Sequence, residues 1–324
     1  MLYRECQSCV QVGNNTSSWF ETKRGVQQGS ALSPFWFVLI MDEILKQIKV
    51  EMATEVNALV FADDVVIWGH TEQEIQEKLN IWNKKFKEFK LTVSKEKTVV
   101  LTIGNIQNSP TLKLDNNTLK NVDHFSYLGS TINKIGTDTL EVTSRLNKAS
   151  TFYHQVRSLL WDEKVPRKAK LTMYNTYFLP ILTYSLETCT LNRKDQSRIQ
   201  AAEMKFLRTS VRKTRHDKVQ NTNIREQFGC NRTIQEMIRM ARLAWFGHVK
   251  RMEEGRVAKV WLEREIGGKR KVGRPRKKWM DIVKEDLKMK GKHIQQVEEE
   301  ELYRDRSGWK RLISTPGRLE LLQR

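Results

Sequence analysis

Two adjacent aspartates, Asp63 and Asp64, stand between two apolar runs in the stretch NALVFADDVVIWGH, residues 57–70. Both runs are rich in β-branched and aromatic residues, which favour strands. The pattern predicts two short strands joined by a turn that carries both aspartates. Because an ionised carboxylate is costly to bury without a compensating partner, the pair must lie at an open strand end or hold a cation.

Such a turn offers hard oxygen ligands of the kind that Mg²⁺ prefers. From these residues alone, an ordinary Asp-Asp turn in a buried hairpin explains the pattern equally well. The upstream block RGVQQGSALSP, residues 24–34, also has two interpretations. Its Gly25 and Gly29 allow a close backbone approach or a positive φ, and Gln28 offers both a donor and an acceptor. The block is either a surface for a polymer backbone or a tight turn into a buried helix.

Hydrophobic periodicity divides the chain into a mixed part and a helical part. Before about Thr139, the predicted order is strands, a helix over 34–48, the acidic hairpin, an amphipathic helix over 71–90 and further strands. This order fits a compact antiparallel sheet backed by two helices. After Thr139 the apolar residues recur at helical spacing, and Pro180 is expected to kink or end one helix. The predicted fold class is therefore α+β.

The formal net charge of +19 is concentrated in one block of the chain. Residues 141–280 hold 32 Lys and Arg against 13 Asp and Glu, whereas the remaining residues hold 25 of each. A field of this sign and size indicates a polyanion such as nucleic acid as the partner. An acidic protein partner and mere solubility are the alternatives.

Cysteine content and apolar runs bear on where the protein is located. The sequence has 4 cysteines, no signal-peptide pattern, and no apolar run that approaches the length of a membrane span. These features predict an intracellular protein that is neither secreted nor inserted in a membrane.

Four motifs, GVQQGSALSP, FADD, LTVSKEKT and YLGSTI, occur in this order. They resemble the second half of the reverse transcriptase domain of non-LTR (LINE-type) retrotransposons. The later stretches AWFGHVKRM, GRPRKKW and DRSGW resemble the carboxy-terminal region of endonuclease–reverse transcriptase polyproteins. The resemblance implies RNA-directed DNA synthesis, with an RNA template, a DNA primer or target and deoxynucleoside triphosphates as partners. Mg²⁺, or alternatively Mn²⁺, is the implied cofactor.

The resemblance also implies three regions. A partial polymerase palm, with an antiparallel sheet and helices, is expected over residues 1–135. A helical thumb-like or connection region is expected over 136–232. A basic helical carboxy-terminal region follows over 233–324, with a linker at 265–278.

Individual residues acquire roles through the same resemblance. Asp63 corresponds to an aspartate that ligates the catalytic metal, and Asp64 beside it supports the metal site. Hard oxygens suit metal ions that bridge a nucleophile and a leaving group. Lys97 matches a lysine near the triphosphate, although Ser94 stands where asparagine is more usual. The remaining matches are Gln28, Gly29 and Phe61 for template and nucleotide binding, and Tyr127, Leu128 and Gly129 for the hairpin that grips the primer.

One part of the family pattern has no match. A two-metal polymerase site takes carboxylates from two separate segments, and the family's other aspartate lies upstream of the Gly-Gln-Gly block. Only 24 residues precede Gly25, and Glu5 and Glu21 among them do not sit in a matching motif. We therefore expect a chain truncated at its amino end that does not polymerise alone. The alternative is a non-catalytic RNA- or DNA-binding protein derived from such an element, in the nucleus, the cytoplasm or both.

The run KRKVGRPRKK, residues 269–278, carries a further signal. Its centre, Arg274, Pro275 and Arg276, has the pattern of an AT-hook, in which an extended Arg-Pro segment enters a narrow minor groove. The run equally fits a nuclear localisation signal or a solvated linker.

Two other patterns have simpler explanations. Trp245 and Phe246, next to several cations, could stack a base, but their helical spacing favours packing in a core. Cys6 and Cys9 have the spacing of a zinc ligand pair, but no second close Cys or His pair follows. The sequence therefore favours core packing for the aromatic pair and gives little support for zinc.

Overall fold

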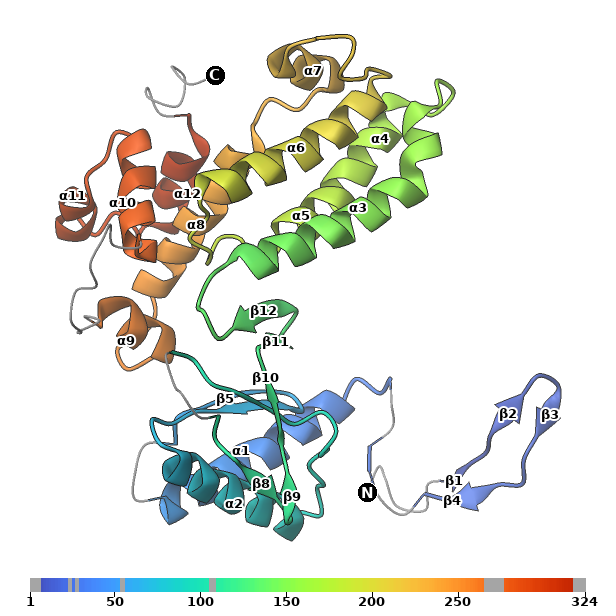
Figure 1. The fold of residues 1–324 in the computed structure, drawn as a ribbon, viewed down its shortest axis with the longest axis vertical. Coiled ribbons are helices and arrows are strands. Elements are labelled where there is room, and N and C mark those ends of the chain that lie inside the picture. The colour runs from blue at the N-terminus through green and yellow to red at the C-terminus, as the bar shows by residue number, and fades with distance from the viewer. Residues whose placement is uncertain are drawn as a thin grey trace. The chain divides into compact units, whose positions relative to one another are not determined.

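The computed structural model describes residues 7–22, 25–26, 29–52, 56–104, 109–264 and 277–316. The chain divides into two compact units, Met1–Asp123 and His124–Arg324. The first mixes short strands with helices, and the second is mainly helical (Figure 1). The α+β class predicted from the sequence is confirmed at this level. The three predicted regions, with boundaries after residues 135 and 232, stay predictions.

In the described part of the first unit, short strand pairs surround two helices. The elements are β1 (Gln7–Ser8), β2 (Gln11–Val12), β3 (Asn15–Thr16), β4 (Phe20–Glu21), α1 (Ser33–Glu51), β5 (Ala58–Phe61), β6 (Asp64–Ile67), α2 (Glu72–Glu88), β7 (Val99–Leu101), β8 (Lys113–Leu114), β9 (Asn117–Thr118) and β10 (Lys120–Val122).

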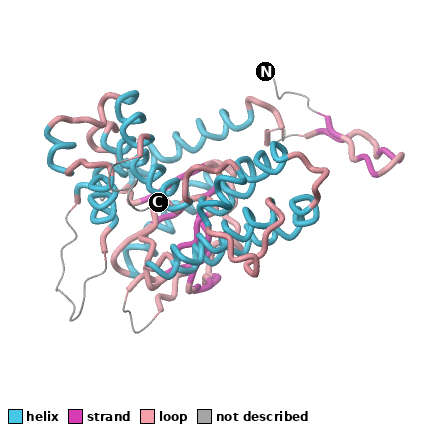
Figure 2. The backbone as a smooth tube through the Cα atoms, turned by 90° about the horizontal axis from the view of Figure 1, so that it is seen from above, coloured by secondary structure: helices cyan, strands magenta, loops and turns pink. Residues whose placement is uncertain are grey.

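The strands pair only two at a time within the described residues. Figure 2 draws them as short magenta segments. β7 and β10 run parallel, whereas the pairs β1–β4, β2–β3, β5–β6 and β8–β9 are antiparallel. A continuous antiparallel sheet is therefore not formed by these residues, in contrast to the expectation from the sequence. Since isolated strand pairs are marginally stable, the helices must supply most of the core.

Helices α1 and α2 enclose the larger core of the first unit. Ile44 and Ile48 of α1 are fully buried and pack with Trp82 of α2. Thr71 caps α2 by accepting a hydrogen bond from the Glu74 backbone N–H at 3.2 Å. In a capping box the Glu74 carboxylate would accept from the backbone N–H of Thr71. Here it accepts instead from the His70 N–H at 2.8 Å. The capping motif is thus extended by one residue toward the hairpin.

The second unit begins with a hairpin and continues as a bundle of helices. Its described elements are β11 (His124–Tyr127), β12 (Ser130–Asn133), α3 (Thr139–Trp161), α4 (Arg167–Met173), the π-helical turn η1 (Tyr174–Phe178), α5 (Leu179–Thr183), α6 (Arg193–Ser210), α7 (Asn221–Phe228), α8 (Ile234–Lys250), α9 (Val257–Glu263), α10 (Trp279–Met289), α11 (Ile294–Glu299) and α12 (Arg306–Ser314).

Two hydrophobic clusters stabilise the second unit, and α8 contributes to both. Ile234 and Ile238 of α8 belong to the cluster built by α3 to α7, while Leu243 and Phe246 belong to the cluster with α10 to α12. The predicted core packing of Phe246 is therefore confirmed. For Trp245 that prediction is wrong, because its side chain remains 37% exposed, with its ring centroid 5.4 Å from that of His248.

Pro180 perturbs its helix without ending it. The Leu179 N–H bonds back to the carbonyl of Tyr174, five residues earlier, which is the spacing of a π turn. Proline lacks an N–H and its ring crowds the preceding turn, so a wider turn accommodates it. The expected disruption at Pro180 thus takes the form of a π bulge between α4 and α5.

Candidate metal and nucleic-acid site

The two aspartates lie at the tip of the β5–β6 hairpin. Phe61 pairs with Asp64, and Val60 with Val65, so Ala62 and Asp63 form a two-residue turn. The hairpin predicted from the sequence is therefore present. One detail differs, because Asp63 lies in the turn whereas Asp64 is already the first residue of β6.

The hairpin has one packed face and one open face. Val60 and Val65 pack against the core of α1 and α2. Side chains alternate along a strand, so Phe61 and its partner Asp64 share the other face. Phe61 is 61% exposed there. An aromatic ring and a carboxylate therefore stand side by side on a surface that a ligand can reach.

The backbone at the hairpin tip is strained. Ala62 has a φ of 49°, in the left-handed region that favours glycine. A positive φ at the first central residue is typical of a type II′ turn. For a residue with a Cβ this conformation costs about 1–2 kcal/mol. The strained turn places Asp63 and Asp64 at the end of the hairpin.

Asp63 and Asp64 are both exposed, and neither side chain has a hydrogen bond or ion pair with any described residue. No third Asp, Glu, His or Cys in the described ranges joins them in a metal-binding cluster. The two carboxylates thus offer hard oxygen ligands to a metal ion, and no cationic side chain of the described residues pairs with them. Mg²⁺ commonly binds through one or two carboxylates together with water and substrate phosphates, so these residues fit that ion.

The structure describes parts of two other predicted motifs of the first unit, the glycine block and the turn with Lys97. Gly25 and Gly29 have φ values of 98° and 85°, so the predicted positive φ is confirmed at both. Gln28 lies outside the described residues. Lys97 is exposed in a turn that the Ser94 carbonyl closes by accepting from the backbone N–H and hydroxyl of Thr98, at 3.1 and 2.6 Å.

The residues expected to grip the primer form the tip of the β11–β12 hairpin. Tyr127 pairs with Ser130 across a two-residue turn of Leu128 and Gly129. Both turn residues have positive φ, 48° and 78°, which defines a type I′ turn. Leucine is an unusual first residue for such a turn, so Leu128 stores strain there.

This second hairpin is tied to the helical bundle by residues that the sequence analysis missed. The Tyr184 hydroxyl donates to the Leu128 carbonyl at 2.7 Å, and Arg145 donates to the Gly129 carbonyl. The Arg145 guanidinium lies 4.6 Å from the centre of the Tyr184 ring and is paired with buried Glu141. The Glu141 carboxylate also accepts from the Thr131 N–H at 2.7 Å. The hairpin therefore has a fixed position on the helical unit.

The Glu141–Arg145 spacing of four residues was a usable sequence signal, since such residues face each other on a helix. Nothing local indicated their burial or the contact with Tyr184. The candidate DNA-binding residues Arg274, Pro275 and Arg276 lie outside the described residues, as does Cys6.

Comparison with known proteins agrees with the motifs. Residues 2–132 match the reverse transcriptase (RNA-dependent DNA polymerase) family. An uncharacterised transposon-derived protein of Caenorhabditis elegans is 25% identical over 241 residues, which covers 71% of this chain and 84% of that protein. No solved structure matches the chain.

Two further relatives are Pol polyproteins of the type-1 retrotransposable element R2. The one from Popillia japonica is 25% identical over 197 residues, covering 55% of this chain and 31% of the polyprotein. The one from Nasonia vitripennis is 33% identical over 84 residues, covering 24% and 8% respectively. The chain thus spans most of its nematode relative and less than a third of either R2 polyprotein. It carries a reverse transcriptase domain. In this domain and in these relatives the chain is similar to the reverse transcriptases of non-LTR retrotransposons.

None of the helices in the described ranges combines the length and the apolar character that crossing a membrane requires.

Proposed function

We propose that the chain takes part in RNA-directed DNA synthesis, with the β5–β6 hairpin as a carboxylate arm of the polymerase metal site. The observation that carries this proposal is the exposed Asp63–Asp64 pair, which has no internal partner and lies on a strained hairpin tip within the segment that matches reverse transcriptases. Asp63 is the proposed direct ligand of Mg²⁺, and Asp64 its support.

The bound metal would supply charge stabilisation to the reacting phosphate oxygens. The protein residues have binding and orienting roles in this proposal. Phe61, exposed beside Asp64, provides an apolar surface for a base or sugar. Lys97 offers a cation for the triphosphate, and the backbone at Gly29 admits the template closely because it carries no side chain. Gln28 is proposed to act with Gly29.

In the second unit, Tyr127, Leu128 and Gly129 are proposed to contact the primer strand. The contacts from Tyr184 and Arg145 support this role, because a hairpin held by both side chains presents its tip in one conformation. Residues 1–135 are proposed to act as part of a palm, residues 136–232 as a thumb-like or connection region, and residues 233–324 as a carboxy-terminal region. The charge surplus in residues 141–280 supports an RNA template and a DNA primer or target as partners.

Primer extension on an RNA template with Mg²⁺ and deoxynucleoside triphosphates tests the proposal. The variant is Asp63→Asn. The matched control is Asp115→Asn, which removes a carboxylate from the turn between β8 and β9, where Asp115 bonds Asn83 at 2.8 Å and pairs with Lys87. If the wild type extends the primer, we expect that this extension survives in Asp115→Asn and is lost in Asp63→Asn.

Undiminished extension by Asp63→Asn would overturn the proposal. A lack of extension by the wild type would agree with the expectation that this chain does not polymerise alone. Binding of the metal, which needs no turnover, would then decide the role of Asp63.

A further inference from the structure

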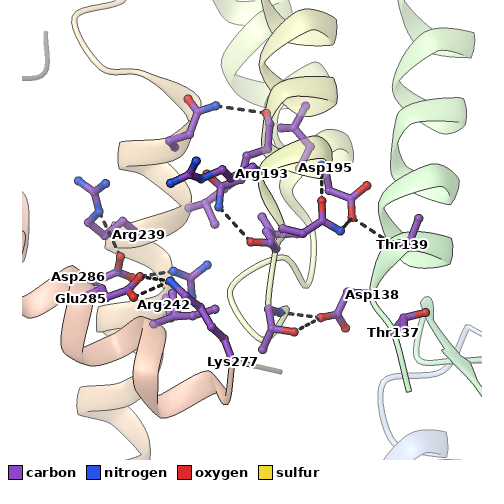
Figure 3. Close-up of a pocket in the computed structure, with 18 of the residues that line it drawn as sticks. Thr137, Asp138, Thr139, Arg193, Asp195, Arg239, Arg242, Lys277, Glu285 and Asp286 are labelled. Atoms are coloured by element: carbon purple, nitrogen blue, oxygen red, sulfur yellow. Dashed lines mark hydrogen bonds and ion pairs between the residues drawn. The ribbon is translucent and has the colours of Figure 1, made fainter. Parts of the chain in front are cut away.

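A large cleft lies within the helical unit, away from any residue assigned a role above. It has a volume of about 1110 Å³ and is bordered by the N-terminal ends of α3 and α6 and by α8 and α10 (Figure 3). This volume reaches the upper limit of small-molecule pockets, so the cleft suits an extended ligand. Its lining contains both charged and apolar side chains, and the apolar members are Leu191, Ile199, Ile238, Ile282 and Met289.

The carboxylates beside α8 and α10 are already paired. Asp286 is buried and accepts from Arg242 at 2.6 Å and from Arg239 at 3.2 Å. Burial raises the pKa of the Asp286 carboxyl, and the two guanidinium groups oppose this rise. Glu285 is paired with Lys277 at 2.5 Å. This wall therefore presents no unpaired negative charge to a ligand.

The carboxylates on the opposite wall also have hydrogen-bond partners. Asp138 accepts from the backbone N–H and the hydroxyl of Thr190, at 2.6 and 2.7 Å. Asp195 is buried and accepts from Asn192 at 2.6 Å and from Thr139 at 3.1 Å. These acids hold the ends of α3 and α6 in place.

Three cations of the lining retain donors without partners. Arg193 and Lys288 are exposed, and neither forms an ion pair with a described residue. Arg242 is only 5% exposed, and its Nε makes no hydrogen bond in the described structure. A buried donor without a partner calls for an explanation such as a ligand or water. The cleft thus combines acids that are already paired with cations that still have N–H donors without partners.

The position of Arg193 strengthens this interpretation. Arg193 is the first residue of α6, where the helix dipole disfavours a cation. The positive end of the helix dipole and the Arg193 guanidinium therefore both favour an anion at this end of the cleft. We propose that the cleft binds the phosphodiester backbone of a single nucleic-acid strand, with Arg193 and Lys288 contacting phosphates and the Nε–H of Arg242 as a buried donor.

A single strand fits better than a duplex because its unpaired bases can pack on the apolar lining. A duplex would present mainly phosphates to the same surface. The ligand chemistry is shared by RNA and single-stranded DNA. The inference rests on the nucleic-acid partner of the proposed function, and it adds a binding site that does not involve Asp63.

Fluorescence anisotropy across a salt series, using the full chain, tests the inference. The probes are an unstructured RNA oligonucleotide, a DNA oligonucleotide of the same base order, and a blunt DNA duplex. The test variant is Arg193→Gln with Lys288→Gln. The matched control is Arg157→Gln with Lys168→Gln, which removes two exposed cations from the far half of α3 and from α4.

Each phosphate contact contributes about 0.7 to the slope of log K against log salt for a single strand, so the test variant should lose about 1.4. The control should retain the wild-type slope. If the test variant has a smaller slope with only one of the two single-stranded probes, that probe identifies the ligand as RNA or as DNA. Arg193→Gln alone should unfold at the same temperature as the wild type or higher, because it removes a cation from a helix N-terminus.

Equal losses in the test and control variants would show a diffuse field and overturn the assignment. An unchanged slope in the test variant would do the same. Duplex binding with the same dependence on Arg193 and Lys288 would overturn the preference for a single strand. The salt series measures strand binding without metal or turnover, which separates failure of this inference from failure of the proposed metal site.

Discussion

The buried ion pair between Glu203 and Arg225 should be essential to the helical unit. Glu203 is 0% exposed, and it accepts from Arg225 Nη1 and from the Tyr174 hydroxyl, both at 2.8 Å. Arg225 is 6% exposed and also donates to the Arg232 carbonyl at 3.0 Å. Burial raises the pKa of Tyr174, so its hydroxyl remains a neutral donor. The Glu203→Gln substitution keeps the shape of the side chain but leaves Arg225 as a buried charge without a counter-ion.

Breaking a buried pair in this way costs about 3–5 kcal/mol of unfolding free energy. In a unit of this size, each kcal/mol lowers the melting temperature by roughly 2–4 °C, so a fall of roughly 6–20 °C is expected. Thermal unfolding followed by circular dichroism measures it. The control is Glu163→Gln, which breaks the exposed pair with Arg212 and should cost at most about 1 kcal/mol.

A double variant, Glu203→Leu with Arg225→Met, separates charge from packing. It removes both charges together, so it should be more stable than Glu203→Gln alone even though Tyr174 loses its acceptor. The reasoning is refuted if Glu203→Gln unfolds like Glu163→Gln, or if the double variant is less stable than the single one.

Three further predictions concern a turn, a thiol and an acid. Leu128→Asn should stabilise the protein by about 0.5–1 kcal/mol, because asparagine tolerates the left-handed conformation of the type I′ turn, and a lower melting temperature would contradict this. Burial raises the pKa of the Cys189 thiol, so peptide mapping after iodoacetamide treatment should find Cys189 modified only in denaturant; modification in the folded protein as fast as that of Cys230 would contradict it. The hydrogen bond from Lys78 lowers the pKa of Glu74 below its ordinary 4.5, so its stabilising contribution is complete above pH 4.5 and is lost as the pH falls through the folded-state value. Glu74→Gln should therefore flatten the dependence of melting temperature on pH in this acidic range, and an unchanged pH profile would contradict it.

The features that the sequence predicted are those encoded within a few residues of the chain. Apolar spacing located α1 and α2. The strand-formers around Asp63 and Asp64 located the β5–β6 hairpin. Each signal depends on neighbours no more than four positions apart, so no tertiary information was needed.

The features that the sequence did not predict depend on contacts between distant residues. Arg145 and Tyr184 meet at the β11–β12 hairpin although they are far apart in sequence. The parallel pairing of β7 with β10, and the lack of a continuous sheet in the described residues, likewise follow from tertiary packing. Propensity and periodicity identify strands, but they do not specify which strands pair. The prediction that Trp245 packs in a core was wrong for the same reason, because helical spacing alone does not decide which neighbours cover a ring.

Metal binding at the β5–β6 hairpin tests the central claim most directly, because it does not depend on turnover. Mn²⁺ can replace Mg²⁺ as a probe detected by electron paramagnetic resonance, with an RNA–DNA primer–template and a deoxynucleoside triphosphate present. We predict bound Mn²⁺ in the wild type and in Asp115→Asn, and its loss in the double variant Asp63→Asn with Asp64→Asn. Equal Mn²⁺ binding by that double variant and the wild type would contradict the assignment of the hairpin as a metal site.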